Sequence, residues 1–289
     1  MPVVAWVNGE YVDINRPAIA IEDRGYQFGD GVYEVIRLYQ GQPFALKEHL
    51  ERLEKSLAAI ELELPKGFSM EDLVQLVQEG AQKSEFDSAF VYLQVSRGVR
   101  ERDHSIPAQN EPVLVMTVRP FIPHTPEAWE EGMAAVTLPD ERWLRCDIKT
   151  TNLLPNVLAI SKAEKMGADE AILVREGVGV TECTRTNLFM VRDGCVYTAP
   201  TGRYILPGIS RQIVLKLMSI HRLPYREQFF TADALAGAEE IFTTGTGREV
   251  FPVTSLNGRP VGNGLPGAMT RKLAELFRGY VQETLGERS

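Results

Sequence analysis

One lysine, Lys149, stands in a sequence context that suits covalent amine chemistry. It follows the apolar Ile148 and precedes a run of hydroxyl and amide side chains, Thr150-Thr151-Asn152. We expect a helix to begin near Pro155, because proline tolerates the first helical turn. A lysine at a strand end, partly removed from water and facing small polar groups, can act as a nucleophile. The alternative is a surface lysine whose carbon chain packs on the protein while its amine stays in water.

Two glycine-containing turns could each bind a phosphate group. The segment 206–211 reads Leu-Pro-Gly-Ile-Ser-Arg and opens a predicted helix that extends to about Ile220. Glycine followed by serine at a helix start leaves backbone N–H groups and a hydroxyl facing outward. The segment 241–248 is a predicted strand that ends in a Gly-Thr-Gly turn, a second possible phosphate cradle. Neither turn identifies a ligand alone, since most Gly-Ser helix starts bind none.

Together, these features match the requirements of pyridoxal phosphate. A desolvated lysine can hold its aldehyde as a Schiff base, and a carboxylate from a strand can keep its ring nitrogen protonated. The protonated ring then withdraws electrons from the substrate α-carbon. The phosphate group needs N–H donors, hydroxyls and usually an arginine.

Two loops could contact a substrate. Three glycines within 25–31, followed by an alternating strand, suggest a shaped loop that delivers Tyr33 to a cavity; a plain turn before an edge strand is the alternative. The polar loop 98–107 carries Arg102 and His104, which could clamp a carboxylate. A solvated run of charges is the alternative reading of that loop.

The elements that must position these residues follow from local patterns. Asn8-Gly9 predicts a tight hairpin. Apolar residues spaced by three and four predict helices over 46–60 and 70–83, with Arg52 off the apolar face of the first and therefore in solvent by default. The remaining predicted elements are strands at 89–97, 112–118, 170–174, 179–191 and 195–198, helices at 155–166 and 266–285, and a hairpin at Asn257-Gly258.

Composition excludes several classes of protein. The chain has 289 residues, 44% of them hydrophobic, and a formal charge of −8, which argues against a nucleic-acid surface. Apolar runs fall short of the roughly 18 residues of a membrane span. The N-terminus lacks the pattern of a secretion signal, and the three cysteines show no metal-ligand spacing. We therefore expect a cytoplasmic protein with reduced thiols and no metal.

The chain resembles the fold-type IV pyridoxal-phosphate enzymes, the branched-chain aminotransferase-like superfamily, and within them the D-amino-acid transaminase branch. The resemblance covers essentially the whole length. Three segments carry it: Asp23–Val35, Arg142–Lys149 and Val180–Glu182. It implies an α/β (α+β) fold with a small N-terminal α/β domain and a larger C-terminal domain with a barrel-like sheet. We place these domains at 1–118 and 126–289, with a proline-rich linker at 119–125 and the cofactor in the cleft between them.

The resemblance also implies roles for individual residues. Lys149 matches the Schiff-base lysine, which shuttles a proton between the substrate α-carbon and the cofactor, and Glu182 matches the partner of the pyridine nitrogen. Leu206 matches a residue that packs on the cofactor ring. The residues that match phosphate-binding positions are Arg52, Ile209, Ser210 and Thr246. The residues that match the trap for the substrate α-carboxylate are Tyr33, Arg102 and His104. Arg102 and His104 are expected to come from the neighbouring subunit, so the family implies a homodimer with shared active sites.

Two places depart from the family pattern. Cys183 and Arg185 stand where the transaminases usually carry Gly and Ser. Gly245, Gly247 and Arg248 stand where Ser and Thr are common at the second phosphate turn. Either arginine could pair with a second substrate carboxylate and favour D-Glu or D-Asp; alternatively, both face solvent or the phosphate.

The predicted reaction is ping-pong transamination between a D-amino acid and a 2-oxo acid, of the D-alanine and 2-oxoglutarate type. Three chemistries on the same scaffold are alternatives: a branched-chain L-amino-acid transaminase, an aminodeoxychorismate lyase and a transaminase for (R)-amines. The Arg102–His104 pair argues against the first two. A catalytically inactive module that binds a vitamin B6 compound is a fourth alternative, which intact Lys149 and Glu182 argue against.

Overall fold

The computed structural model describes residues 3–286 of the chain. The chain divides into two compact units. The first extends up to Pro123 and also takes in Ile148–Asn152, and the second comprises His124–Asp147 and the chain from Leu153 onward. The segment that carries Lys149 therefore belongs to the first unit, although it is flanked on both sides by residues of the second.

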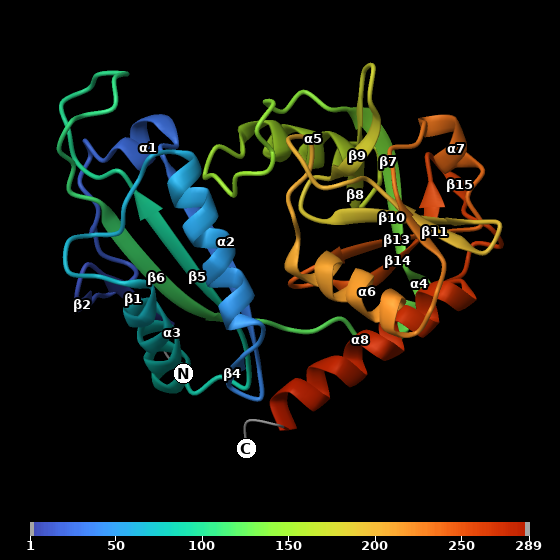
Figure 1. Ribbon diagram of the computed structural model, residues 1–289, viewed down its shortest axis with the longest axis horizontal. Coiled ribbons are helices and arrows are strands. Elements are labelled where there is room, and N and C mark those ends of the chain that lie inside the picture. Colours follow the sequence, from blue (N-terminus) through green and yellow to red (C-terminus); the bar gives the residue numbers. More distant parts are fainter. Residues whose placement is uncertain (1–2, 287–289) are drawn as a thin grey trace. The chain divides into compact units, whose positions relative to one another are not determined.

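In the described part of the first unit, six strands form one antiparallel sheet in the order β2-β1-β6-β5-β3-β4 (Figure 1). The strands are β1 (Val4–Val7), β2 (Glu10–Tyr11), β3 (Gly31–Tyr39), β4 (Gln42–Pro43), β5 (Ser88–Ser96) and β6 (Val113–Pro120). The predicted hairpin is confirmed, since Asn8 and Gly9 have positive φ between β1 and β2. Alternate residues of β5, from Ala89 to Val95, are fully buried and face the core.

Helices α2 (Leu46–Ala59) and α3 (Met70–Ser84) supply the other half of this core. Both match the predicted helices to within one residue at each end. Ser69 caps α3 through a reciprocal pair of hydrogen bonds with Asp72, which explains why that helix starts where it does. The sequence patterns do not predict one further helix: α1 (Arg24–Phe28) is capped by Asp23 and lies within the glycine-rich segment expected to be a loop.

In the described part of the second unit, nine strands form one mixed sheet, and β15 pairs only with β14. The pairs β14–β7, β7–β8 and β11–β12 are parallel, and the other pairs are antiparallel. The strands are β7 (Met133–Pro139), β8 (Glu170–Arg175), β9 (Gly179–Cys183), β10 (Asn187–Arg192), β11 (Cys195–Thr198), β12 (Tyr225–Glu227), β13 (Glu240–Gly245), β14 (Glu249–Leu256) and β15 (Arg259–Pro260). The predicted fold class, with its barrel-like second sheet, is confirmed.

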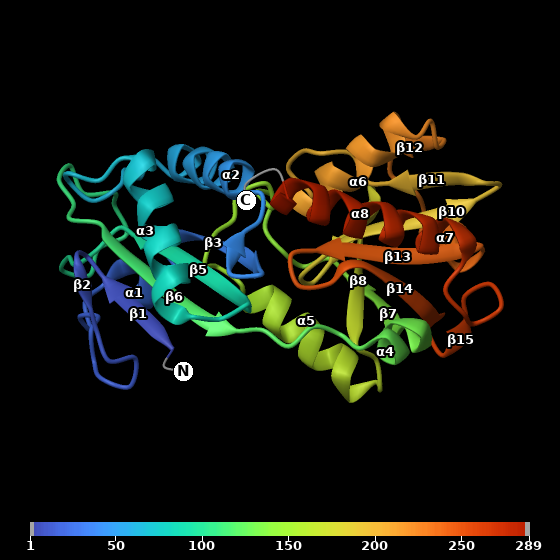
Figure 2. The ribbon, with the colours of Figure 1, turned by 90° about the horizontal axis from the view of Figure 1, so that it is seen from below.

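The helices of this unit are α4 (Pro126–Glu131), α5 (Leu154–Lys165), α6 (Ile209–Ile220), α7 (Ala232–Ala236) and α8 (Ala268–Gly286). Helices α6 and α8 lie side by side against β13, as Figure 2 shows. Helix α5 packs on β7 and β8 through a small apolar cluster around Ala163 and Leu173. Among residues 3–286, none of the helices is both long and apolar enough to span a bilayer.

The prediction of a single strand over 179–191 is wrong. β9 ends at Cys183 and β10 begins at Asn187, because the N–H and hydroxyl of Thr184 donate to the buried carboxylate of Glu170. Cys183 N donates to the carbonyl of Thr186 in the turn that results. β9 pairs with β8 whereas β10 pairs with β13, so the chain changes neighbour at this turn. β6 continues to Pro120, into the first two residues of the predicted linker. The two-domain boundaries at 118 and 126 stay a prediction.

Candidate active site

Lys149 lies in a short extended segment fastened to β3, not at the end of a regular strand as expected. Its carbonyl accepts from Tyr33 N at 2.9 Å, and its N–H donates to Ser56 Oγ at 3.2 Å. The hydroxyls of Thr150 and Thr151 donate to the carbonyls of Gly31 and Gly29 at 3.1 and 2.8 Å. The polar run after the lysine therefore fixes its backbone.

The side chain of Lys149 is half-buried and approaches an aromatic face. Its Nζ lies 4.2 Å from the ring centroid of Tyr33, the residue whose backbone also pairs with Lys149. The Tyr33 ring in turn stacks on Tyr92, with centroids 5.5 Å apart. Burial raises the pKa of Tyr92 to about 12, so this phenol stays neutral at ordinary pH. The structure thus brings together the amine and one member of the predicted carboxylate trap.

Arg52 faces the protein interior, which corrects the expectation that solvent surrounds it. Only 7% of the residue is exposed. Its Nε and Nη2 donate to the two carboxylate oxygens of Glu34 at 2.7 and 2.9 Å, and His49 Nδ1 contacts the same carboxylate at 2.7 Å. Glu34 is fully buried on the core face of β3, between Val32 and Ile36.

These buried charges shift one another's titration. Burial would raise the pKa of Glu34, but the Arg52 guanidinium and His49 hold it well below its usual range. Burial lowers the pKa of His49, and Glu34 opposes that effect. Sequence reasoning missed Glu34 and His49. A carboxylate at an inward position of an apolar strand was the available signal, because a buried charge needs a partner.

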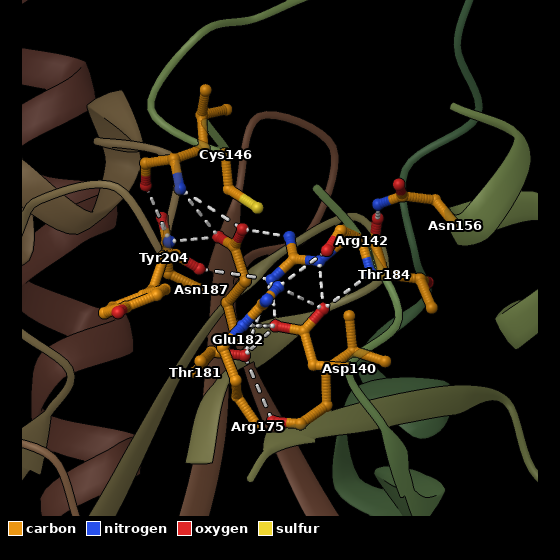
Figure 3. Close-up of polar contacts among 12 residues, drawn as sticks. Asp140, Arg142, Cys146, Asn156, Arg175, Thr181, Glu182, Thr184, Asn187 and Tyr204 are labelled. Carbon is orange, nitrogen blue, oxygen red and sulfur yellow. Dashed lines mark hydrogen bonds and ion pairs between the residues drawn. The ribbon is translucent and has the colours of Figure 1, made fainter. Parts of the chain in front are cut away.

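In the second unit, Glu182 is the centre of a buried polar cluster (Figure 3). Asn187 Nδ2 donates to its Oε2 at 2.9 Å, and Leu206 N lies 3.1–3.2 Å from both oxygens. Arg142 Nη1 donates to Oε1. Burial raises the pKa of Glu182, and Arg142 and the Leu206 N–H oppose that rise. These hydrogen bonds together hold one carboxylate in a fixed orientation.

Arg142 is itself held by a second carboxylate, Asp140. Its Nε and Nη2 donate to Asp140 at 2.9 and 3.0 Å, and Arg175 and Thr181 also donate to Asp140. Burial opposes ionisation of Asp140, but Arg142 keeps its pKa below the ordinary value. Two arginines and two carboxylates thus alternate across the cluster (Figure 3). Sequence reasoning missed Asp140 and assigned no role to Arg142, although Arg142 begins one of the motifs.

The predicted phosphate-binding residues of this unit lie at two turns. Ile209 and Ser210 form the first turn of α6 and are 4% and 7% exposed. Among the described residues, no side chain caps that helix, whose N-cap is Gly208. A Cβ at Gly208 would lie 2.0 Å from Asn187 Oδ1, so the packing of Asn187 leaves no room for a side chain at this position. Asn187 Nδ2 also donates to the Leu206 carbonyl and thereby ties this turn to Glu182.

Thr246 lies in the tight turn between β13 and β14. Within residues 3–286, Oγ1 of Thr186 and Oγ1 of Thr244 are buried and have no hydrogen-bond partner. Thr244 precedes Gly245, and a Cβ at Gly245 would lie 2.9 Å from the methyl group of Thr186. Two unsatisfied hydroxyls thus border this turn. A buried hydroxyl without a partner is costly, and an anion at the turn could accept from both.

The two arginines that depart from the family pattern, Arg185 and Arg248, lie near an internal carboxylate, Glu170. Arg185 Nε lies 4.0 Å from Glu170 Oε2, and the same charge acts on the half-buried Arg248. Glu170 is fully buried, and Thr184 donates to its other oxygen through both N–H and hydroxyl. Cys183 is 1% exposed, and burial raises the pKa of its thiol well above the ordinary value.

Arg102 and His104 lie on an exposed loop of the first unit, and both side chains contact the ring of Phe28. The structure therefore groups Tyr33, Arg52 and Lys149 in one unit, together with this loop. The site residues that belong to the other unit are Glu182, Leu206, Ile209, Ser210 and Thr246. The roles of all these residues stay predictions.

Comparison with known proteins identifies the family. The family described as Amino-transferase class IV matches residues 31–256. A D-alanine aminotransferase of Staphylococcus haemolyticus is 40% identical over 277 residues, covering 96% of this chain and 97% of that protein. A D-alanine aminotransferase of Bacillus licheniformis is 43% identical over 275 residues, 95% of each chain.

Solved structures agree with this family. The branched-chain amino acid aminotransferase of Escherichia coli superposes with a TM-score of 0.88 at 27% identity, covering 96% of this chain and 94% of that chain. The branched-chain aminotransferase of Thermoproteus uzoniensis, solved with norvaline, has a TM-score of 0.86 at 26% identity, with 96% and 94% coverage. The family and fold expected from the motifs are thus confirmed: the chain belongs to the class IV aminotransferases and is an aminotransferase with the fold-type IV architecture.

Proposed function

We propose that this aminotransferase uses pyridoxal 5'-phosphate to transfer the amino group of a D-amino acid to a 2-oxo acid in a ping-pong reaction. The observation that carries the cofactor assignment is the Glu182 carboxylate, buried and held by Arg142, Asn187 and Leu206. A branched-chain aminotransferase with a TM-score of 0.88 to this chain was solved with pyridoxamine 5'-phosphate, which supports it. Selectivity for D-amino acids is supported by the relatives named D-alanine aminotransferase, which are 38–43% identical over almost the whole chain.

The residues present fit this cofactor. A phosphate group would satisfy the Thr186 and Thr244 hydroxyls and the uncapped N–H groups of α6, beside Ser210 and Thr246. The chemistry of the donor set, a lysine amine and a buried carboxylate, fits its aldehyde and its basic ring nitrogen. Arg52, already held by Glu34, is proposed to contact the phosphate as well.

When bound, pyridoxal phosphate supplies an aldehyde for attachment of the substrate amine and a ring that accepts electron density from the substrate α-carbon. Lys149 is proposed to anchor it and to move a proton to and from that carbon. Glu182 holds a proton at the ring nitrogen, and Arg142 keeps the carboxylate in place. Leu206 is proposed to pack on the ring, and its N–H already orients Glu182.

The substrate α-carboxylate is proposed to bind Tyr33, Arg102 and His104. A guanidinium and an imidazole separated by one residue on an exposed loop can both donate to one carboxylate. In the proposed homodimer, Arg102 and His104 serve the active site of the neighbouring subunit, so each site is shared. The small-molecule partners are accordingly D-amino acids and 2-oxo acids.

A second candidate is transamination of branched-chain L-amino acids. Solved structures that superpose with TM-scores of 0.86–0.88 are branched-chain aminotransferases, at 26–28% identity. Identity to the D-alanine aminotransferases is higher, which favours the D-selective reaction. The same scaffold leaves (R)-amines and the aminodeoxychorismate lyase reaction as further outcomes of the test.

The test is a scan of half-reactions. Purified holoenzyme is mixed separately with D-Ala, D-Glu, L-Leu, L-Glu and (R)-1-phenylethylamine, and the absorbance of the bound cofactor is followed. We expect rapid spectral change with D-Ala or D-Glu and little with the L-amino acids. Faster reaction with L-Leu than with either D-amino acid would contradict the proposal, and reaction confined to the amine would identify an amine transaminase.

A further inference from the structure

Arg24 and Asp30, in the motif Asp23–Val35, are charged residues that the proposed chemistry does not use. Arg24 is 4% exposed although it lies in the short surface helix α1. Its Nε donates to Asp30 Oδ2 at 2.8 Å, and its Nη1 donates to the carbonyl of Asp103 at 2.5 Å. Asp103 stands between Arg102 and His104, the two residues proposed to bind the substrate carboxylate.

A second residue of α1, Phe28, contacts both of those side chains. The guanidinium carbon of Arg102 lies 4.5 Å from the centroid of the Phe28 ring, and the His104 ring centroid lies 5.4 Å from it. The guanidinium carbon of Arg24 lies 4.9 Å from the same centroid. One ring thus contacts Arg24 and both proposed carboxylate-binding groups, and cation–π attraction favours the positions of the two arginines.

The start of the 98–111 loop is held by backbone hydrogen bonds that do not involve the Arg24 side chain. Arg24 N donates to the Gly98 carbonyl at 2.9 Å, and Arg100 N donates to the Glu22 carbonyl. A Cβ at Gly98 would lie 1.8 Å from the Glu111 carbonyl oxygen, so the two ends of the loop meet there. Figure 1 shows this loop, between β5 and β6, beside α1. The Arg24 side chain then holds the segment that carries Arg102 and His104.

Asp30 provides the anchor for Arg24. It also accepts from Nε of Arg97 at 2.9 Å, and Arg97 is as deeply buried as Arg24, at 2% exposed. The other donors of Arg97 point elsewhere, to the carbonyls of Ile60 and Glu61 at the end of α2. Arg97 is therefore buried like Arg24 and donates to the same carboxylate, Asp30. Its other side-chain donors bind carbonyls at the end of α2 and not the 102–104 segment.

We propose that Arg24 and Phe28 are positioning residues for the substrate-carboxylate site, which set the places of Arg102 and His104 through the Asp103 carbonyl and the Phe28 ring. This inference rests on the proposed function of Arg102 and His104. In this proposal, the Arg24–Phe28 part of the glycine-rich motif positions the carboxylate-binding loop, in addition to leading the chain into β3.

The first test compares two holoenzyme variants, Arg24→Lys and Arg97→Lys. A lysine at 24 can still neutralise Asp30, but its single ammonium group cannot also occupy the place of Nη1 at Asp103. We expect Arg24→Lys to raise KM for D-Ala on the order of tenfold with kcat much less changed, the size of effect of one charge-assisted hydrogen bond. Arg97→Lys is expected to lower thermal stability while KM stays within about twofold of wild type.

Amide hydrogen exchange supplies a readout that does not depend on activity. In Arg24→Lys, the amides of 102–105 are expected to exchange faster than in wild type, whereas in Arg97→Lys they keep their wild-type rates. Phe28→Leu, which keeps an apolar side chain but removes the ring, is expected to raise KM for D-Ala as well. If Arg24→Lys does not fold, Phe28→Leu serves as the test in its place.

A double-mutant cycle with Arg102→Ala decides whether Arg24 acts through the loop. If it does, Arg24→Lys adds little to the KM of Arg102→Ala, because the group that it positions is gone. Effects that multiply overturn the inference, as do equal changes in KM for Arg24→Lys and Arg97→Lys. If the wild type reacts with D-amino acids and Arg102→Ala raises KM, but Arg24→Lys and Phe28→Leu leave KM unchanged, this inference is wrong and the proposed function stands. A wild type without activity toward D-amino acids overturns the proposed function and this inference with it.

Discussion

Arg142 and Glu182, 40 residues apart in the chain, form a buried ion pair in which Nη1 of the arginine donates to Oε1 of the carboxylate. Arg142 is also bound through Nε and Nη2 to Asp140, so it cannot follow Glu182 if that side chain moves. The pair therefore fixes the direction of Glu182 rather than merely neutralising its charge. Restriction of this kind is expected where a carboxylate must meet one particular nitrogen of a cofactor.

Replacement of Lys149 by alanine is expected to lower transamination of D-Ala by at least about 100-fold, because one amine serves as both anchor and proton carrier. The variant should still fold, since the backbone bonds of Lys149 to Tyr33 and Ser56 do not need the side chain. Steady-state turnover without added amine is the measurement. Lys55→Ala, an exposed position on α2, is the control, and near-wild-type turnover by Lys149→Ala would refute the assignment.

The variant Glu182→Gln should lower kcat by roughly tenfold to a hundredfold and change KM less, because a neutral amide stabilises a protonated ring nitrogen poorly. Steady-state kinetics with D-Ala measures both constants. Glu176→Gln, in the exposed turn between β8 and β9, provides the matched control. If kcat is unchanged in Glu182→Gln, Glu182 does not act on the ring nitrogen.

The change Gly208→Ala places a Cβ against Asn187 Oδ1, which must then move away from Glu182 and Leu206. We expect affinity for pyridoxal phosphate to fall by roughly tenfold, the cost of about one buried hydrogen bond. Equilibrium binding of the cofactor by the apoenzyme is the measurement. Gly237→Ala is the control, because a Cβ there meets its nearest atom at an ordinary 3.8 Å. Equal affinities in the two variants would disprove the argument.

Loss of the Glu34 carboxylate should destabilise the protein in a pH-dependent way. Glu34→Gln leaves Arg52 buried without its carboxylate, at a cost of about 3–5 kcal/mol at pH 7. Because the folded-state pKa of Glu34 is depressed, its stabilisation is present above the unfolded value of roughly 4.3 and is lost as pH falls below it. The difference in melting temperature between wild type and variant should therefore narrow below about pH 4.3. The exposed Glu63→Gln serves as control, and a difference that stays constant down to about pH 3 is the contrary result.

Substitution of Arg185 and Arg248 tests whether the enzyme recognises a second substrate carboxylate. Since Arg185 already lies 4.0 Å from Glu170, we expect Arg185→Ser to change the ratio of kcat/KM for D-Glu over D-Ala by less than about twofold. Arg248→Ser tests the more buried guanidinium in the same way. A fall of about tenfold or more in the ratio, in either variant, would support recognition of D-Glu through that arginine.

Local patterns in the sequence predict the regular elements of the first unit well. The helices at 46–60 and 70–83 and the hairpin at Asn8-Gly9 are present within one or two residues of their predicted bounds. Their determinants act over a few residues: the spacing of apolar side chains, the Ser69–Asp72 cap and the positive φ of the turn. Helix α1 escapes sequence-based prediction because five residues with glycines within and beside them give no periodic signal.

The break between β9 and β10 depends on tertiary structure. The sequence 179–191 favours extended backbone throughout, which explains the prediction of one strand. Its course changes at Thr184, whose N–H and hydroxyl bind the buried carboxylate of Glu170 on β8. β9 therefore ends because the Thr184 N–H donates to the Glu170 side chain and not to a neighbouring strand.

The resemblance of three sequence segments to a known family predicted the family, which the comparisons confirm, and the proposed roles of Lys149 and Glu182. Tertiary structure alone decided three contacts of buried arginines: Arg52 with Glu34, Arg142 with Glu182, and Arg24 with the backbone carbonyl of Asp103. In that order, these partners lie 18, 40 and 79 residues apart. Periodicity reports which face of an element is buried, whereas the partner of a buried charge depends on which distant element packs against it. The physical reason is that burial makes an unpaired charge costly, and only the packed chain determines where the compensating charge can lie.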